Sequence, residues 1–201
     1  YGGLQLPPVF AAHMVLQRHK PIPFYGKANA HQKVRIQFAG KTQQTTTTAD
    51  GNWKLSFPAL KAGGPYTAII EAGDKKITLT DILIGEVWLC SGQSNMYFQL
   101  QQSENAAAEM MEAQNKQRLR LLKMQPIAET DAYAWDSTLL QKTNNLQYFA
   151  GSWQVCDSNQ AKTFSAVAYF FAKKLQQQLN VPVGLIQVAV GGSDTESWID
   201  R

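Results

Sequence analysis

A short apolar run that ends in a small-residue turn is the feature that most constrains this chain. The residues from Ile82 to Cys90 are apolar except for Gly85 and Glu86, which predicts a buried strand. The run stops at Ser91-Gly92, a turn signal, and a helix-like segment follows. A strand that ends in this way holds its turn side chains at the carboxyl end of a sheet, where open α/β proteins bind ligands. Ser94, in this turn, is therefore our candidate nucleophile.

The same residues have a plainer interpretation. Ser, Gly, Gln and Asn are common where a strand turns into a helix, and Ser94 or Asn95 can serve as a helix cap. The nucleophile motif of α/β-hydrolases does not decide the matter, because it has the form Gly-x-Ser-x-Gly and its last position here is Met96. From the residues alone, both interpretations stay open.

The wider segment resembles a known family. Gly92-Gln93-Ser94-Asn95-Met96, preceded by Glu86-Val87-Trp88-Leu89-Cys90-Ser91, is similar to the first motif block of the sialate O-acetylesterase family, which are SGNH-type carbohydrate esterases. The resemblance implies that Ser94 is the nucleophile and that its own backbone N–H contributes to an oxyanion hole. We expect Gln93 and Asn95, on either side of Ser94, to line the substrate.

A second predicted strand ends in a similar turn. The apolar residues from Val183 to Val190 predict a buried strand, and Gly191-Gly192-Ser193 follows it. Two such turns at one edge of a sheet would bring Ser94 and Gly192 close together. Glycine lets a backbone N–H approach an oxyanion without a Cβ in the way, although paired glycines are also typical of a tight turn alone.

This second turn also matches the family. The residues from Gly191 to Trp198 resemble the family's Gly-Gly-Thr…Glu-x-Trp block, with Ser193 in place of Thr. The resemblance implies that the N–H of Gly192 is an oxyanion-hole donor. Glu196 and Trp198 match as well, and we interpret them as structural or substrate-lining residues rather than as acid and base.

Between the two turns, the pattern predicts helices and one strand. Residues 99–116 are good helix formers, 119–124 predict a short strand closed by Pro126, and 128–152 show no clear period. The aromatic residues near that loop either stack on sugars or pack against the core. Residues 164–179 form the clearest helix, capped by Thr163 and ended by Asn180 and Pro182. Its expected apolar face consists of Phe164, Val167, Ala168, Phe171, Leu175 and Leu179.

The first 80 residues predict strands throughout. Alternating patterns cover 33–38 and 53–57, shorter strands are predicted over 45–48, 66–70 and 77–79, and Gly, Pro and Asp turns separate them. We therefore expect a small all-β sandwich domain over residues 1–81, followed by the amino-terminal part of an SGNH-like α/β domain over 82–201. That second domain would be a three-layer fold around a parallel sheet, incomplete in this chain. The sandwich core should include Val34, Ile36, Phe38, Trp53, Leu55 and Phe57.

Met14-Val15-Leu16-Gln17-Arg18, Asp50-Gly51-Asn52-Trp53 and Ala62-Gly63-Gly64-Pro65-Tyr66 also look similar to family segments. The resemblance implies that the β domain is not catalytic.

The chain contains no evident base for a serine nucleophile. Histidine is the usual base, but the three histidines are His13, His19 and His31, and none follows residue 31. The resemblance implies that an Asp-x-x-His near the carboxyl terminus of the complete esterase supplies it. We therefore expect a partner in the remaining carboxyl-terminal portion of the same esterase. We also expect an exposed strand edge near residues 183–190 and little activity from this chain alone.

Composition and sequence patterns bear on nucleic-acid binding, membrane spans, cofactors and the state of the cysteines. Residues 1–80 hold ten basic residues against three acidic ones, but no basic run is interleaved with aromatics, so we expect no nucleic-acid partner. No apolar run is long enough for a membrane span, and no metal or organic cofactor is implied. Cys90 and Cys156 are either free or bridged.

The favoured function is a serine esterase that removes O-acetyl groups from carbohydrates, with an acetylated glycan as substrate. The alternative is a non-catalytic glycan-binding module or an inactive fragment. A glycan substrate and the family together suggest a location outside the cytoplasm, periplasmic or secreted, or lysosomal or extracellular if the source is eukaryotic.

Overall fold

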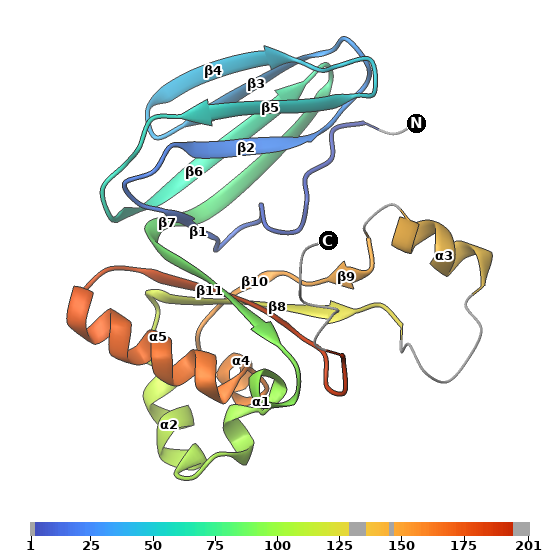
Figure 1. The fold of residues 1–201 in the computed structure, drawn as a ribbon. Coiled ribbons are helices and arrows are strands. Elements are labelled where there is room, and N and C mark those ends of the chain that lie inside the picture. Colours follow the sequence, from blue (N-terminus) through green and yellow to red (C-terminus); the bar gives the residue numbers. More distant parts are fainter. Residues whose placement is uncertain (1–2, 129–135, 145–146, 195–201) are drawn as a thin grey trace.

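The computed structural model describes residues 3–128, 136–144 and 147–194 (Figure 1). The strands are β1 (Val15–Gln17), β2 (Ile22–Lys27), β3 (Lys33–Phe38), β4 (Lys41–Thr46), β5 (Asn52–Phe57), β6 (Gly63–Ala72), β7 (Lys75–Gly92), β8 (Leu119–Pro126), β9 (Phe149–Ala150), β10 (Trp153–Val155) and β11 (Val183–Ala189). The helices are α1 (Ser94–Tyr97), α2 (Ala106–Ala113), α3 (Ser137–Asn144), α4 (Ser158–Lys162) and α5 (Ala166–Leu179), with a 3₁₀ turn over Leu100–Gln102.

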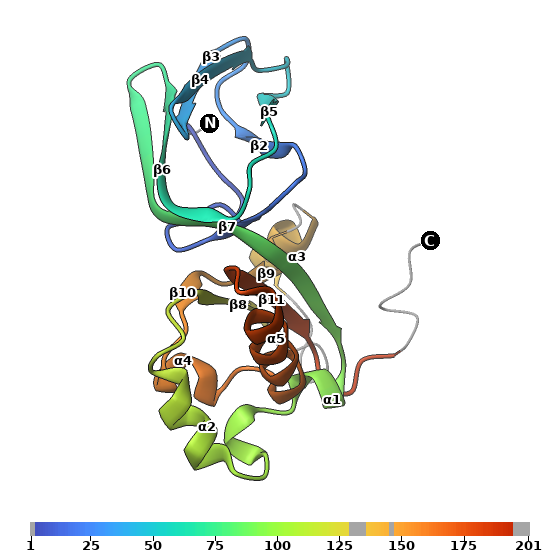
Figure 2. The same cartoon turned by 90° about the vertical axis from the view of Figure 1, so that its left-hand side faces the viewer.

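Strand β7 connects the strand-rich part of the molecule to the part that contains the helices. Its first half pairs antiparallel with β6, and from Glu86 onward it pairs parallel with β11. The sheet order is β10-β8-β11-β7-β6-β3-β4, with β1 beside β7 at Leu83–Gly85 (Figures 1 and 2). We expected this strand to begin at Ile82, next to a domain boundary near Asp81. The ladder instead runs through that point, so the division into two domains stays a prediction.

The core of the strand-rich part agrees with the alternating pattern. The six expected core residues are all buried, and β2 and β5 form a separate two-stranded sheet that faces β3 across this core. The ring of Phe38 lies 5.4 Å from that of Phe24 and 5.5 Å from that of Phe57, measured between centroids. The same cluster includes Leu122 and Trp153 from the second part, so the apolar core continues onto the sheet of β8 and β11.

The second part of the chain is a mainly parallel sheet with helices on one face. Strands β7, β11 and β8 are parallel, and β10 is antiparallel to β8. Helices α2, α4 and α5 lie on the side of this sheet away from the strand-rich part (Figure 2). Their residues join buried side chains of these strands in a second core. This is a mixed α/β fold with a central sheet, as predicted, while the complete three-layer arrangement stays a prediction.

Two helix predictions need correction. Residues 99–116 do not form one helix, because Ser103 bonds back to the Leu100 carbonyl at 2.7 Å and Asn105 is left-handed, which separates the 3₁₀ turn from α2. Helix α5 is capped by Ser165, whose hydroxyl oxygen accepts from the Ala168 N–H at 3.3 Å, and not by Thr163. Asn180, in the left-handed conformation, ends α5 as expected.

The exposed strand edge lies at β7. We expected it near residues 183–190, but β11 lies between β7 and β8 and is largely buried. From Glu86 to Gly92, no strand among the described residues pairs with the other side of β7. Leu89 is 64% exposed and Trp88 is 43% exposed, although strands of parallel sheets are normally covered on both faces.

The face of α5 next to β7 is exposed to solvent as well. Val167, Phe171 and Leu179 belong to the face that we expected to be buried, yet all three are exposed. The ring of Phe171 packs edge-on against Trp88 at 5.0 Å between centroids. The exposed apolar surface therefore runs from the edge of β7 onto the adjacent side of α5.

Candidate active site

Ser94 lies where β7 gives way to α1, and its side chain is exposed. The strand ends at Gly92, whose φ of +148° favours glycine because a Cβ is strained in that conformation. The residue that caps α1 is Gln93, and no side chain makes a cap hydrogen bond there. The Ser94 hydroxyl has no hydrogen-bond partner among the described residues, so the helix-cap interpretation does not explain it.

The turn after β11 lies beside the turn after β7. Ala189 pairs with Gly92, and the N–H of Val190 donates to the Gly92 carbonyl at 3.1 Å. The hydroxyl of Ser193 donates to the Val190 carbonyl at 2.8 Å, which closes the second turn. The structure therefore brings together the two turns that carry Ser94 and Gly192, as the parallel-sheet argument predicts.

The backbone around Gly192 is open. Its φ is +77°, and apart from its chain neighbours no described residue has an atom within 4 Å of the point where a Cβ would stand at Gly191 or Gly192. Both glycines are exposed. Gln93 and Asn95 are exposed at the same edge, whereas Glu196 and Trp198 lie outside the described residues.

A buried polar contact fixes the position of α1. Gln187 of β11 is 1% exposed, and its Oε1 accepts from the backbone N–H of Ser165 at 2.8 Å. The hydroxyl of Ser165 in turn lies 3.2 Å from Sδ of Met96, which belongs to α1. Sequence reasoning missed both residues. The available signal was a glutamine inside an otherwise apolar strand, because a buried amide requires a polar partner.

Lys123 adds a positive charge near the same helix. Its Nζ donates to the carbonyl of Thr163 at 2.7 Å and lies 5.8 Å from the ring centroid of Tyr97. Burial lowers the pKa of Lys123, since the charged form is partly removed from water.

The histidines lie far from Ser94. Nδ1 of His13 is 2.7 Å from Oδ2 of Asp81, and Asp81 also accepts from Arg120 at 2.5 and 3.2 Å. Arg120 and Val87 both pair with Gly184, so they lie side by side in the sheet. Val87 comes five residues before Gly92, the end of β7, which is about 17 Å along an extended strand. His13 therefore lies toward the amino end of the parallel strands, whereas Ser94 lies at their carboxyl end.

His19 and His31 do not approach the site either. They precede β2 and β3, and all three histidines occupy turn positions with φ between 56° and 67°. No described group of histidine, cysteine, aspartate and glutamate residues is arranged to hold a metal ion. Across residues 3–128, 136–144 and 147–194, no helix is long and apolar enough to cross a membrane.

The comparison with family models identifies the second part of the chain. Residues 84–201 match the model described as carbohydrate esterase, sialic acid-specific acetylesterase. The chain belongs to this acetylesterase family. Its matched region includes both turns of the candidate site, so the family assignment rests on the part of the fold that positions Ser94 and Gly192.

Individual relatives agree with the family. Human sialate O-acetylesterase is 32% identical over 150 residues, which are 73% of this chain and 28% of that protein. The rat sialate O-acetylesterase is 26% identical over 208 residues, covering 94% of this chain and 36% of the relative. The crystal structure of XAC1771, a carbohydrate acetylesterase from Xanthomonas citri, has a TM-score of 0.84 at 31% identity. That match covers 98% of this chain and 43% of XAC1771. The chain thus spans about a third of the curated relatives' length.

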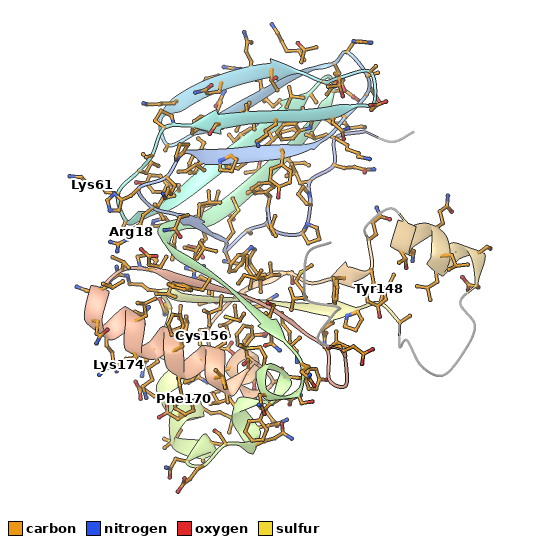
Figure 3. All side chains as sticks on the ribbon, viewed as in Figure 1. Arg18, Lys61, Tyr148, Cys156, Phe170 and Lys174 are labelled. Carbon is orange, nitrogen blue, oxygen red and sulfur yellow. The ribbon has the colours of Figure 1, made fainter. Side chains whose placement is uncertain are left out.

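The two cysteines and Trp153 of this acetylesterase family member are buried. Cys90 and Cys156 are free and buried, and burial raises their pKa values to about 11 and 12 (Figure 3 labels Cys156). Trp153 packs in the core and donates from Nε1 to the Val9 carbonyl at 2.9 Å. Tyr148 and Phe149 pack edge-on at 5.0 Å, and Trp135 lies outside the described residues.

Proposed function

We propose that this chain carries the nucleophile-bearing portion of a serine esterase that removes O-acetyl groups from carbohydrates, acetylated sialic acids among them. The observation that carries the proposal is the hydrogen bond between the Val190 N–H and the Gly92 carbonyl, because it sets the two family motifs side by side. The exposed Ser94 hydroxyl, which has no structural partner among the described residues, supports the same assignment.

In the proposed reaction, Ser94 Oγ attacks the acetyl carbonyl carbon and passes its proton to a histidine. The N–H groups of Ser94 and Gly192 donate to the oxyanion of the tetrahedral intermediate, and each such donor is worth on the order of 10²–10³ in rate. The sugar oxygen leaves with the proton from histidine. Water, deprotonated by the same histidine, then releases acetate and restores Ser94.

The histidine must come from outside these 201 residues in this mechanism. His13 lies toward the far end of the strands, and His19 and His31 lie in turns of the strand-rich part. The open edge of β7 and the greater length of the relatives support a further portion that completes the sheet and supplies an Asp-x-x-His. We further expect the complete esterase to act outside the cytoplasm, where acetylated glycans occur.

A labelling experiment tests the nucleophile. Residues 1–201 would replace the matching part of XAC1771 in a single chimeric chain, a design supported by the similarity of the two folds. A fluorophosphonate should label this chimera at one serine, and peptide mass spectrometry should locate the label on Ser94. Ser94→Ala should abolish labelling. Ser91→Ala, which removes another exposed serine near the same turn, should leave it unchanged. Labelling of a different serine would overturn the assignment.

A further inference from the structure

A groove of about 1180 Å³ crosses the strand-rich part of the molecule. Its walls are the segment Gly3–Pro8, the adjoining ends of β2 and β5 with their turns, and the residues around β9. No residue of β7, β11 or α1 lines it, so it is separate from the turns that carry Ser94 and Gly192. The proposed esterase reaction therefore leaves the groove without a role.

Hydrogen bonds hold the walls of the groove in place. Gln5 and Lys27 exchange backbone hydrogen bonds at 2.8 and 3.0 Å, which fixes the amino-terminal segment along β2. The N–H of Ala28 donates to the Gly51 carbonyl at 2.9 Å and joins the two turns. Across the groove, Phe149 pairs with Pro126 at the end of β8. A site with fixed walls loses little conformational entropy when it binds a ligand.

The groove combines an exposed aromatic ring with exposed polar side chains. Tyr25 is 42% exposed, and its ring is held edge-on against Phe10, with centroids 4.9 Å apart and planes at 76°. Near it, four polar side chains line the groove and make no hydrogen bond or ion pair with any described residue. These are Lys27, Asn29, Asp50 and Asn52.

This chemistry fits a sugar chain. An aromatic face packs against the C–H face of a pyranose ring, while amide and carboxylate groups bond to its hydroxyls. The groove contains one ammonium group and one carboxylate, Lys27 and Asp50, so it offers no net charge to attract an anionic ligand.

We infer that the groove is a second carbohydrate site, which binds an uncharged stretch of a glycan with one sugar ring on Tyr25 and its hydroxyls on Asp50 and Asn52. The inference rests on the carbohydrate chemistry of the proposed function but not on catalysis. Such a site would hold the glycan to the enzyme while Ser94 acts elsewhere on it.

Binding of xylohexaose, an uncharged oligosaccharide without acetyl groups, to the 201-residue chain tests this inference by calorimetry or by NMR. Tyr25→Ala should weaken binding about tenfold or more, equivalent to about 1.4 kcal/mol, whereas Tyr25→Trp should retain it. Phe170→Ala is the matched control, because Phe170 is similarly exposed at 39% but lies on α5 (Figure 3). It should bind like the unmodified chain. Thermal unfolding of each variant checks that the fold is intact.

Three results would overturn the inference: no saturable binding up to millimolar xylohexaose, equal binding by Tyr25→Ala, or a Tyr25-dependent preference for the anionic sialyllactose. Since xylohexaose has no acetyl group, its binding does not depend on the esterase reaction. A negative binding result would therefore not count against the proposed esterase function. A negative labelling result would likewise not count against carbohydrate binding in the groove.

Discussion

In the described part of the chain, no hydrogen bond accounts for the Ser94 hydroxyl, and no side chain packs against Gly192. Ser94 is exposed and makes no hydrogen bond to a described residue, and a Cβ at Gly192 would meet no described atom within 4 Å beyond its chain neighbours. Residues in such positions add little to stability. Their substitution should therefore affect chemistry more than folding.

Gly192→Ala should separate these two effects. Alanine is strained at a φ of +77°, so the turn would shift and its N–H would leave the oxyanion position. In the chimera with XAC1771 we expect a loss of kcat on the order of 10² with a stability loss of about 1 kcal/mol. Gly40→Ala is the matched control. Gly40 has a φ of +73° and equally open surroundings, but lies in the turn between β3 and β4. Equal loss of activity in both variants would remove Gly192 from the mechanism.

Asp81 should make stability depend on pH. The Arg120 guanidinium, together with His13, holds the pKa of Asp81 below its ordinary value of 3.8. The ionised carboxylate therefore stabilises the fold above that pH, and its contribution is lost as the pH falls through the lower, folded-state pKa. At pH 7, Asp81→Asn should cost about 2 kcal/mol, because it leaves the buried Arg120 without its anion.

Urea unfolding at several pH values checks this expectation. The difference between Asp81→Asn and the unmodified chain should shrink below about pH 4. Asp74→Asn, at a carboxylate that is 82% exposed, should change stability little at any pH. A difference that is the same at pH 7 and pH 3 would show that the charge of Asp81 is not what stabilises the fold.

At single residues, the sequence was informative where a local rule applies and silent where the partner is distant. Ser94 and Gly192 follow from small-residue turns after apolar runs. A glutamine inside an apolar strand signals that Gln187 has a polar partner, but no local pattern predicts that this partner is the backbone of Ser165, 22 residues away. Arg120 with Asp81, 39 residues apart, is a similar case.

Among the elements, β7 accounts for most of the differences between the predicted and the observed strands and buried faces. Asp81 has a positive φ of 54°, which is typical of a turn, and beyond it β7 exchanges β6 for β11 as its pairing partner. For these two reasons the sequence pattern predicts two strands where the structure has one. The predicted apolar face of α5 is wider than the surface that α5 buries, because no described strand pairs with β7 on that side. Periodicity predicts that a side chain is buried, but not which element buries it.

The open edge of β7 should make the chain self-associate. Leu89→Lys should reduce this association in sedimentation velocity without lowering stability, since the side chain is 64% exposed and lysine discourages edge pairing. Met111→Lys is the control, because Met111 is 75% exposed on α2, away from the edge. It should leave association unchanged. If the two variants behave alike, the association does not use the edge of β7.

At the scale of the whole molecule, Ser94 and His13 lie toward opposite ends of the parallel strands. The parallel strands carry Ser94 at their carboxyl end, while the histidine beside Asp81 lies toward the other end. The chain covers 43% of XAC1771 and 28% of the human relative. A serine hydroxyl without its base typically loses on the order of 10⁴ to 10⁶ in kcat.

The most direct test of this account is an aryl acetate esterase assay, run on residues 1–201 alone and on the chimera that joins them to the rest of XAC1771, each with and without Ser94→Ala. The account predicts no Ser94-dependent turnover by the 201-residue chain, and turnover by the chimera that Ser94→Ala abolishes. Ser94-dependent turnover by the chain alone would show that these 201 residues already contain a working base. Turnover by the chimera that survives Ser94→Ala would show that Ser94 is not the nucleophile.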